Sequence, residues 1–162
     1  MVDVAESAQR KSLEPTVFRV KETAERDALV GSHCAKCDRN YFPPRQWCAA
    51  CFEPGCEEIE LSREGTLSSF ALVERKQEYC LVEAPYAFGE VRLPEGMLVY
   101  TTLNVTSEAA SNGGIRVYST IDQDNFNILR TGQRVKLAPL VIRRGDDGAE
   151  VVAYSFDVVE GG

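Results

Sequence analysis

Cys34-Ala-Lys-Cys37 and Cys48-Ala-Ala-Cys51 are two Cys-x-x-Cys motifs joined by a short loop, residues 38–47. Two such motifs place four thiolates within reach of one ion, which is the ligand set of a tetrahedral structural zinc site. The loop between them is long enough for a hairpin but too short for a helix. The spacing therefore predicts a zinc ribbon whose ligands are Cys34, Cys37, Cys48 and Cys51.

Three other interpretations use the same cysteines: two disulfides, a redox-active Cys-x-x-Cys pair, or an iron site with four thiolates. Paired motifs of this spacing are far more often metal sites, so zinc is the leading interpretation. Iron is the strongest alternative, because the sequence does not separate metals that share four thiolates. Cys56 and Cys80 lie outside the motifs as spare cysteines.

The composition is typical of a globular protein with one domain and a smaller module: 162 residues, of which 44% are hydrophobic and 27% charged. No run of about 18 apolar residues occurs, and Met1-Val-Asp-Val-Ala-Glu lacks the basic start and apolar core of a signal peptide. We therefore expect a cytoplasmic protein, in a reducing compartment that favours metal over disulfides. The net charge of −7 argues against an extended interface with nucleic-acid phosphates.

Residues 1–28 are predicted to form an N-terminal arm followed by an amphipathic helix. Residues 1–14 are polar and expected to be loose. Between residues 17 and 28 the apolar positions fall three or four apart, which is the period of a helix that packs on its own domain or is offered to a partner. These positions are Val17, Val20, Ala24 and Ala28.

Residues 29–62 are assigned to the zinc ribbon, with a first strand at 29–33 and an acidic connector at 53–60. A unit of roughly 30 residues cannot bury enough apolar surface to fold unaided, so bound metal would supply on the order of 10 kcal/mol. Four thiolates leave no coordination position open for water or substrate, which predicts a structural ion. The loop aromatics would shield the metal, with a partner-docking surface as the alternative. They are Tyr41, Phe42 and Trp47.

Residues 63–162 are predicted to be a β-domain, because short runs of alternating polarity begin near Gly65. Pro94-Glu-Gly96 and Arg144-Gly-Asp-Asp-Gly148 are turns that would each join two strands. A short helix or turn at 122–130 separates the third strand from the fourth. This count and order match an OB-fold barrel, although periodicity alone would allow another small barrel. The predicted strands are 67–73, 89–93, 97–106, 134–143 and 149–158.

Several stretches across residues 16–158 are shared with a known family: Leu29-Val-Gly-Ser-His-Cys34-Ala-Lys-Cys37, Phe42-Pro-Pro-Arg45, Cys48-Ala-Ala-Cys51, Glu64-Gly-Thr-Leu-Ser-Ser-Phe70, Ala84-Pro-Tyr86 and Leu93-Pro-Glu-Gly96. On these the chain resembles the acyl-CoA-associated proteins with a rubredoxin-like zinc ribbon and a C-terminal OB fold, long classed as a domain of unknown function. Pro-Pro-Arg45 is the most specific piece, because many unrelated ribbons share the cysteines. Asp38, Ala49 and Ala71 depart from the usual Gly, Pro and Thr, and none of these removes a metal ligand.

The expected fold is thus mainly β: an N-terminal helix, a rubredoxin-like zinc ribbon and a C-terminal five-stranded OB-fold barrel. The resemblance implies a non-catalytic accessory subunit of a thiolase-fold enzyme, either a thiolase or an aldolase that cleaves side chains of CoA thioesters. The partner would carry the chemistry, while this subunit would stabilise the complex and help hold acyl-CoA. Aromatic or steroid degradation is the expected setting, with benzoylsuccinyl-CoA thiolysis as one example.

Two other functions fit the same modules. A zinc ribbon and an OB fold also build binders of single-stranded nucleic acid, an alternative against which the acidic composition weighs. A free-standing acyl-CoA carrier or sensor is the third candidate. Affinity for single strands that falls with salt would favour the nucleic-acid binder, and tight binding of CoA esters by the isolated protein would favour the acyl-CoA carrier or sensor.

The sequence supplies no catalytic residue, and the chain is not expected to act as an enzyme on its own. A thiolase needs a nucleophilic Cys and a His that accepts its proton. The single histidine, His33, precedes a predicted ligand and is expected to orient or cover the motif, and Cys80 is interpreted as a small apolar residue. CoA phosphates would instead meet Lys36, Arg39 and Arg45 on the ribbon loops, with ordinary solvated charge as the alternative.

Overall fold

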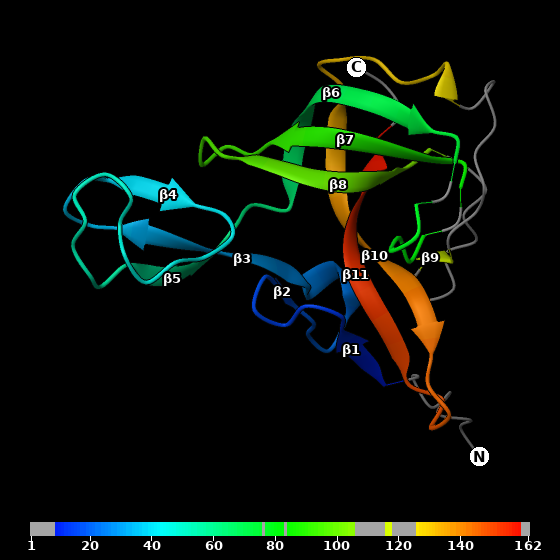
Figure 1. The fold of residues 1–162 in the computed structure, drawn as a ribbon, viewed down its shortest axis with the longest axis horizontal. Helices are drawn as coiled ribbons and strands as arrows, with labels where there is room; N and C mark the ends of the chain where they lie inside the picture. The colour runs from blue at the N-terminus through cyan, green and yellow to red at the C-terminus, as the bar shows by residue number, and fades with distance from the viewer. Residues whose placement is uncertain (1–8, 76, 83, 106–115, 118–125, 160–162) are drawn as a thin grey trace.

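The regular structure of the described residues is almost entirely β-strand (Figure 1). The structure is a computed structural model, and it describes residues 9–75, 77–82, 84–105, 116–117 and 126–159. Within these ranges no helix is long and apolar enough to cross a membrane, and the prediction of a mainly β chain is confirmed. The elements are β1 (Arg10–Ser12), β2 (Phe18–Arg19), the 3-10 turn η1 (Ala24–Arg26), β3 (Ala28–Cys34), β4 (Arg39–Tyr41), β5 (Glu57–Glu60), β6 (Glu64–Val73), β7 (Tyr86–Arg92), β8 (Leu98–Asn104), β9 (Arg116–Val117), β10 (Arg134–Arg144) and β11 (Glu150–Val158).

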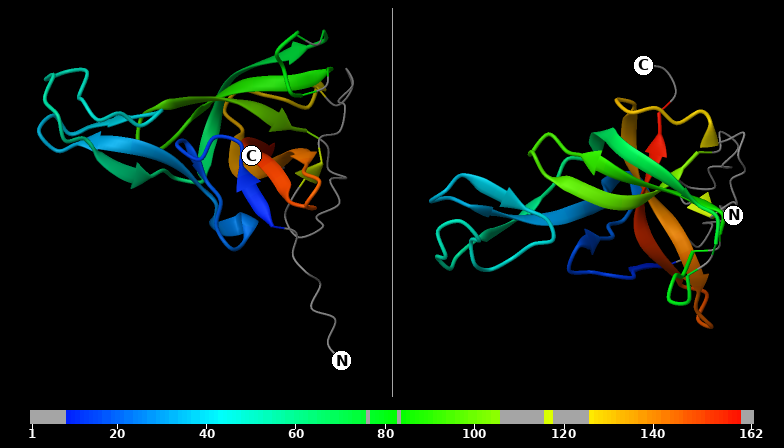
Figure 2. Two further views of the ribbon diagram at one scale, coloured as in Figure 1. Left: turned by 60° about the horizontal axis from the view of Figure 1, so that its bottom comes forward. Right: turned by 45° about the horizontal axis from the view of Figure 1, so that its top comes forward.

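Five of these strands close into a barrel (Figure 2). β7 pairs antiparallel with β6 and β8, and β10 pairs antiparallel with β6 and β11. A parallel pairing of β8 with β11 completes the ring. This strand order is that of an OB fold, and each strand overlaps one of the predicted ranges, so the predicted five-stranded barrel is confirmed.

Apolar side chains at alternate strand positions fill the barrel. Val91, Val99 and Phe156 are fully buried and belong to one hydrophobic cluster. The register of β6 against β7 shifts between Leu67 and Ser69, and such a bulge bends a strand in the way that closure of a small barrel requires.

The ribbon is a small sheet whose central strand, β3, pairs with β4 on one side and β5 on the other. It projects from the barrel as a narrow arm (Figure 1). A Cβ atom at Gly31 would lie 2.7 Å from the carbonyl oxygen of Tyr41, so this close β3–β4 pairing needs glycine. The predicted connector at 53–60 is wrong in its second half, because Glu57–Glu60 form β5 instead of an irregular link.

The predicted helix at 17–28 is also wrong, because this segment forms β2, a loop and η1. Phe18 pairs with Leu29 across the β2–β3 hairpin, and both side chains are fully buried. The ring of Phe18 meets that of Tyr154 edge to face at 6.2 Å. Burial of this aromatic residue against the barrel outweighs the weak helical spacing of the small apolar positions.

A buried carboxylate, Asp27, fixes the segment in this shape. Its side chain accepts hydrogen bonds from the Arg10 guanidinium at 2.5 and 3.2 Å and from the backbone N–H of Lys21 at 2.8 Å. The Arg63 guanidinium donates to the carbonyl oxygens of Asp27 and of Leu137 in β10. We call these residues, Asp27, Arg10, Lys21 and Arg63, the Asp27 cluster; it joins the N-terminal segment to the barrel.

The expectation that residues 1–14 are loose fails for residues 10–12, which form β1 and pair in parallel with residues 150–152 of β11. Of the predicted element at 122–130, residues 126–129 form a turn closed by a 3.0 Å hydrogen bond from the N–H of Leu129 to the carbonyl of Phe126. Residues 118–125 lie outside the described part of the chain.

Candidate metal centre and neighbouring surfaces

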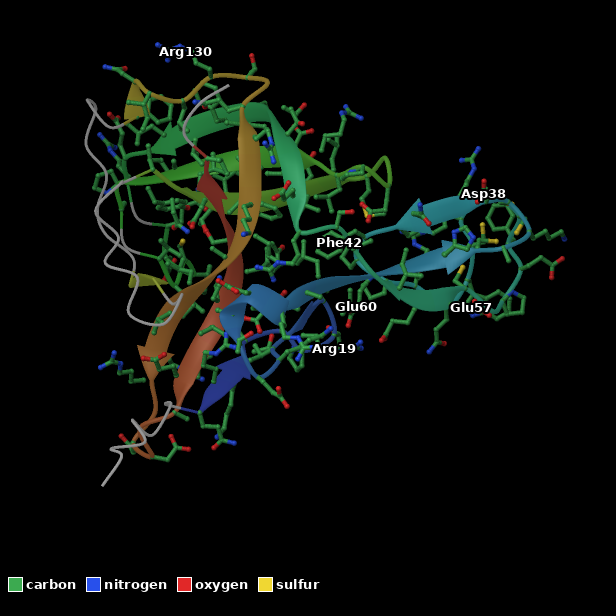
Figure 3. The ribbon with its side chains drawn as sticks, turned by 180° about the vertical axis from the view of Figure 1, so that it is seen from behind. Arg19, Asp38, Phe42, Glu57, Glu60 and Arg130 are labelled. Carbon is green, nitrogen blue, oxygen red and sulfur yellow. The ribbon has the colours of Figure 1, made fainter. Side chains whose placement is uncertain are left out.

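The four cysteines of the two motifs meet at the far end of the ribbon (Figure 3). Their sulfur atoms all lie within 4.8 Å of one another, and the Sγ atoms of Cys34 and Cys51 are 3.8 Å apart. A tetrahedron with metal–sulfur bonds of about 2.3 Å has edges of about 3.8 Å, whereas a disulfide needs about 2.05 Å. The donor set and its spacing therefore fit one tetrahedral ion, and all four thiols are free of disulfides.

Each motif belongs to a tight turn followed by a residue in the left-handed backbone region. Cys34 ends β3, and Asp38, just after Cys37, has φ 53°. Phe52 follows Cys51 in the same way, with φ 59°. The second turn is closed by hydrogen bonds of 3.0 Å between residues 48 and 52 and between residues 48 and 53. The two turns thus repeat one backbone design around the cluster.

Hydrogen bonds make the four thiols of the cluster unequal. The hydroxyl of Tyr41 lies 3.1 Å from Cys48 Sγ, and the backbone N–H of Ala50 lies 3.4 Å from it. Donation from Tyr41, aided by backbone amides, lowers the pKa of Cys48 to about 5. Its hydrogen bond with Cys51 raises the pKa of Cys37 to about 12. Cys48 is therefore the thiol of this pair whose thiolate form the hydrogen-bond donors favour.

The loop aromatics have three different environments, so the prediction that they shield the metal holds for only one of them. Tyr41 contacts the cluster. Phe42 lies where the ribbon meets the barrel, and its ring packs edge to face on Tyr154 at 6.0 Å (Figure 3). Trp47 is 60% exposed, and Phe52, beside the second motif, is 78% exposed.

The three cations predicted to bind CoA do not form one open patch of free charges. Lys36 Nζ lies 3.0 Å from a carboxylate oxygen of Glu53. The Arg45 guanidinium lies over the ring of Tyr41, 4.6 Å from its centroid. Arg39 is exposed on β4. Two of the three side chains thus have partners within the ribbon.

The histidine and the two spare cysteines lie in separate places. His33 Nδ1 is 2.8 Å from Asn40 Oδ1 across the β3–β4 pair, and its role at the first motif stays a prediction. The N–H of Cys56 donates to the carbonyl of Gln46 at 3.1 Å beside the second motif, and burial raises the pKa of the Cys56 thiol. Cys80 Sγ lies 3.5 Å from the hydroxyl of Tyr86 on the barrel.

An apolar groove of about 310 Å³ on the outer face of the barrel was missed by the sequence prediction. The rings of Phe88 in β7 and Tyr100 in β8, which both line the groove, stack on one another with 6.4 Å between centroids. Among the described residues that line it, only Glu14 is charged. Aromatics at outward-facing positions of two paired strands were the available signal. The described lining comprises Leu13, Glu14, Phe18, Tyr79, Cys80, Leu81, Val82, Phe88, Tyr100, Thr102, Leu140, Ile142, Ala153 and Tyr154.

Comparison with known proteins agrees with this architecture. Residues 22–57 match the family model of the ChsH2 rubredoxin-like zinc ribbon domain. Benzoylsuccinyl-CoA thiolase subunit BbsA of Thauera aromatica is 27% identical over 128 residues, which cover 79% of this chain and 74% of that protein. A DUF35 domain-containing scaffold protein of Methanocaldococcus jannaschii is 27% identical over 137 residues, 84% of this chain and 85% of that protein.

A solved structure, the Ltp2-ChsH2(DUF35) aldolase, contains a chain with the same fold. The TM-score is 0.57 at 20% sequence identity, and the match covers 81% of this chain and 84% of that one. Residues 22–57 thus match a ChsH2-type, rubredoxin-like zinc ribbon, and over most of its length the chain is similar to a DUF35 domain-containing protein.

Proposed function

We propose that this protein is a non-catalytic, zinc-containing accessory subunit of a thiolase-fold enzyme that acts on CoA thioesters. The observation that carries the proposal is its similarity, over 79% and 88% of its length, to two proteins named benzoylsuccinyl-CoA thiolase subunit BbsA, from Thauera aromatica and Geobacter metallireducens. The reaction class is thiolytic or aldol cleavage or formation, in aromatic or steroid degradation. The subunit stabilises the complex and helps to bind acyl-CoA.

Zinc at the four-cysteine cluster has a structural role in this proposal. Cys34, Cys37, Cys48 and Cys51 hold the ion and so tie β3 to the loop that precedes β5. Four thiolate ligands fill a tetrahedral site, so no position is left for substrate or water. What the ion supplies is the folding free energy of the ribbon, and we propose residues 29–62 as the ribbon module and 63–162 as the barrel module.

The placement of the reactive side chains supports a non-catalytic role. Claisen-type acyl transfer needs a thiol within hydrogen-bond reach of a base. The one histidine of the chain, His33, contacts Asn40 on the ribbon, whereas Cys80 lies in the barrel groove beside Tyr86. The chemistry is therefore assigned to the partner enzyme.

For CoA we propose that the ribbon cations meet the phosphates while the apolar barrel groove is open to an acyl group. Arg39 is the exposed cation of the set, and the groove offers aliphatic and aromatic walls without a described basic residue. Calorimetric titration of the isolated protein and of the complex with free CoA and with an aromatic acyl-CoA tests both parts. Arg39→Ala should weaken the binding of both free CoA and acyl-CoA, and Tyr100→Ala should weaken only the binding of acyl-CoA.

A single-stranded nucleic acid is the second candidate ligand, because β7 and β8 form the face on which OB folds stack bases and here carry Phe88 and Tyr100. Such binding also needs a basic groove, and among the described lining residues the only charge is the carboxylate of Glu14. Titration with a fluorescent oligonucleotide at low salt, repeated at high salt, separates the two candidates.

The accessory-subunit proposal is tested by capture of the tagged protein from its native host, with mass spectrometry of the partners and metal analysis of the eluate. Recovery of a thiolase-fold protein with one zinc per chain is the expected result. Cys48→Ser should lose both zinc and partner, and Cys80→Ser, a cysteine change outside the cluster, should lose neither. A zinc-loaded protein that emerges alone or with nucleic acid would overturn the proposal.

A further inference from the structure

A tyrosine of the ribbon points its hydroxyl at one of the four clustered sulfur atoms. Tyr41 Oη lies 3.1 Å from Cys48 Sγ, a hydrogen-bond distance for an oxygen–sulfur pair. Tyr41 is the last residue of β4, and its partner across the strand pair is Ser32 of β3. The hydroxyl is therefore aimed from the ribbon sheet and not from the turn that carries Cys48.

Arg45 holds the other side of the same ring. Its guanidinium carbon lies 4.6 Å from the ring centroid of Tyr41, within the range of a cation–π contact. The backbone N–H of Arg45 donates to the hydroxyl of Ser32 at 3.0 Å, and Ser32 is only 2% exposed. The buried side chain of Ser32 thus holds the backbone of Arg45 close to Tyr41, which is the strand partner of Ser32.

Cation binding by four thiolates leaves an excess of negative charge, since a dication neutralises only two of them. Groups that donate hydrogen bonds to the sulfur atoms offset this excess and orient the ligands. Cys48 receives two donors of different kinds, the Tyr41 hydroxyl and the backbone N–H of Ala50 at 3.4 Å. Amide donors come with the turn itself, whereas the hydroxyl depends on one side chain and can be removed by a single substitution.

We propose that Tyr41 is a positioning residue of the metal centre: its hydroxyl donates to the metal-bound sulfur of Cys48, and Arg45 keeps the ring in that orientation. This inference rests on the proposed zinc site. It gives the arginine of the Pro-Pro-Arg stretch a role inside the ribbon, in addition to the proposed role toward CoA.

The test compares zinc-loaded wild-type protein with Tyr41→Phe, which removes only the hydroxyl. Transfer of zinc to a chromogenic chelator should become about tenfold faster, the lower end of the effect of outer-shell substitutions. In the cobalt(II)-loaded proteins, the sulfur-to-cobalt charge-transfer band should move to lower energy, because a thiolate without its hydrogen bond gives up charge more easily. Arg45→Lys, which keeps the charge but loses the planar contact, should speed transfer about two- to fivefold.

Tyr100→Phe is the matched control, because Tyr100 is a 60% exposed tyrosine on the barrel. It should leave the transfer rate and the band unchanged. Faster transfer from Tyr41→Phe with an unchanged band would mean that the ring only packs against the turn, and this would overturn the proposal, as would a wild-type rate. A wild-type chain that takes up neither zinc nor cobalt would instead refute the metal site itself.

Discussion

The barrel and the ribbon are both small β-structures, yet their interiors have little in common. The barrel encloses a continuous apolar cluster in which Val135, Val152 and Phe156 are fully buried. Between residues 33 and 60, all of which are described, only Cys34 and Cys48 are buried, whereas the apolar residues Leu29, Val30 and Leu61 are buried at the two ends of the ribbon segment. The centre of the ribbon is formed by cysteine sulfur atoms, whereas the centre of the barrel is formed by apolar side chains. A strand pattern alone does not make a stable unit, and the source of stability must be identified for each module separately.

The largest expected effect is the loss of the ribbon when its metal is removed. Chelation, or Cys48→Ser, withdraws on the order of 10 kcal/mol from a unit with almost no apolar interior. Trp47, the only tryptophan, lies in the ribbon, so its fluorescence should change while the far-ultraviolet circular dichroism of the barrel largely persists. Cys80→Ser is the control and should behave as wild type. Unchanged Trp47 emission after complete chelation would show that the ribbon is held by its own contacts.

The second effect concerns the Asp27 cluster, which joins the N-terminal segment to the barrel. Asp27→Ala should lower the free energy of unfolding by about 3–5 kcal/mol, because the buried Arg10 guanidinium and the N–H of Lys21 lose their acceptor. Urea denaturation measures it, and zinc content should stay at the wild-type level.

Two further variants serve as comparisons for Asp27→Ala. Asp27→Asn keeps an oxygen for Lys21 and should cost less than Asp27→Ala. Glu22→Ala removes an exposed carboxylate that lies 3.8 Å from Arg26 and should be nearly neutral. If Asp27→Ala were as mild as Glu22→Ala, the cluster would not be the joint between the segment and the barrel.

A smaller effect separates the two metal-binding turns. Phe52 holds a left-handed backbone while its side chain is mostly exposed, so Phe52→Gly should stabilise the zinc-loaded ribbon by about 0.5–1 kcal/mol. Asp38→Gly should be close to neutral, because Asp tolerates that conformation better than Phe does. Thermal unfolding followed through Trp47 ranks the two variants. Destabilisation by Phe52→Gly would mean that the ring contributes contacts that outweigh its backbone strain.

The smallest effect is electrostatic and lies between the ribbon and the N-terminal hairpin. The hydrogen bond from Lys21, at 2.8 Å, lowers the pKa of Glu60, with Arg19 adding to the shift (Figure 3). A lowered carboxyl pKa stabilises the fold above the unfolded value, near 4.3, and this contribution is lost as the pH falls through the folded value. Because these side chains are largely exposed, Glu60→Gln should cost only about 0.2–1 kcal/mol at pH 7 and nothing at pH 2. A cost that persists at pH 2 would point to packing instead of charge.

The features that could be predicted from the sequence are those that a local pattern encodes. Cysteine spacing gave the cluster of Cys34, Cys37, Cys48 and Cys51, whose sulfurs the fold brings together. Alternating polarity gave the five barrel strands, because one face of each strand meets the core. Both signals lie within a few residues along the chain, and no distant partner is needed to interpret them.

What could not be predicted depends on distant contacts. The stretch at 17–28 has helical spacing, but Phe18 is drawn onto Tyr154 and Asp27 onto Arg10, partners that no local window contains. The acidic residues of β5 gave no strand signal, since exposed edge strands carry little apolar periodicity. The contact of Tyr41 with Cys48 was equally hidden, because it depends on the β3–β4 pairing and not on spacing.

The parallel pairing of β1 with β11 has a consequence for how copies of this protein behave toward one another. β8 pairs with β11 only near Phe156 and Asp157, and residues 10–12 pair with its opposite end, residues 150–152. A strand end with open N–H and C=O groups is a template onto which another chain can add. Residues 10–12 therefore protect this end of β11 from pairing with another copy of the chain, and a version that begins after Ser12 should lose solubility before it loses its fold.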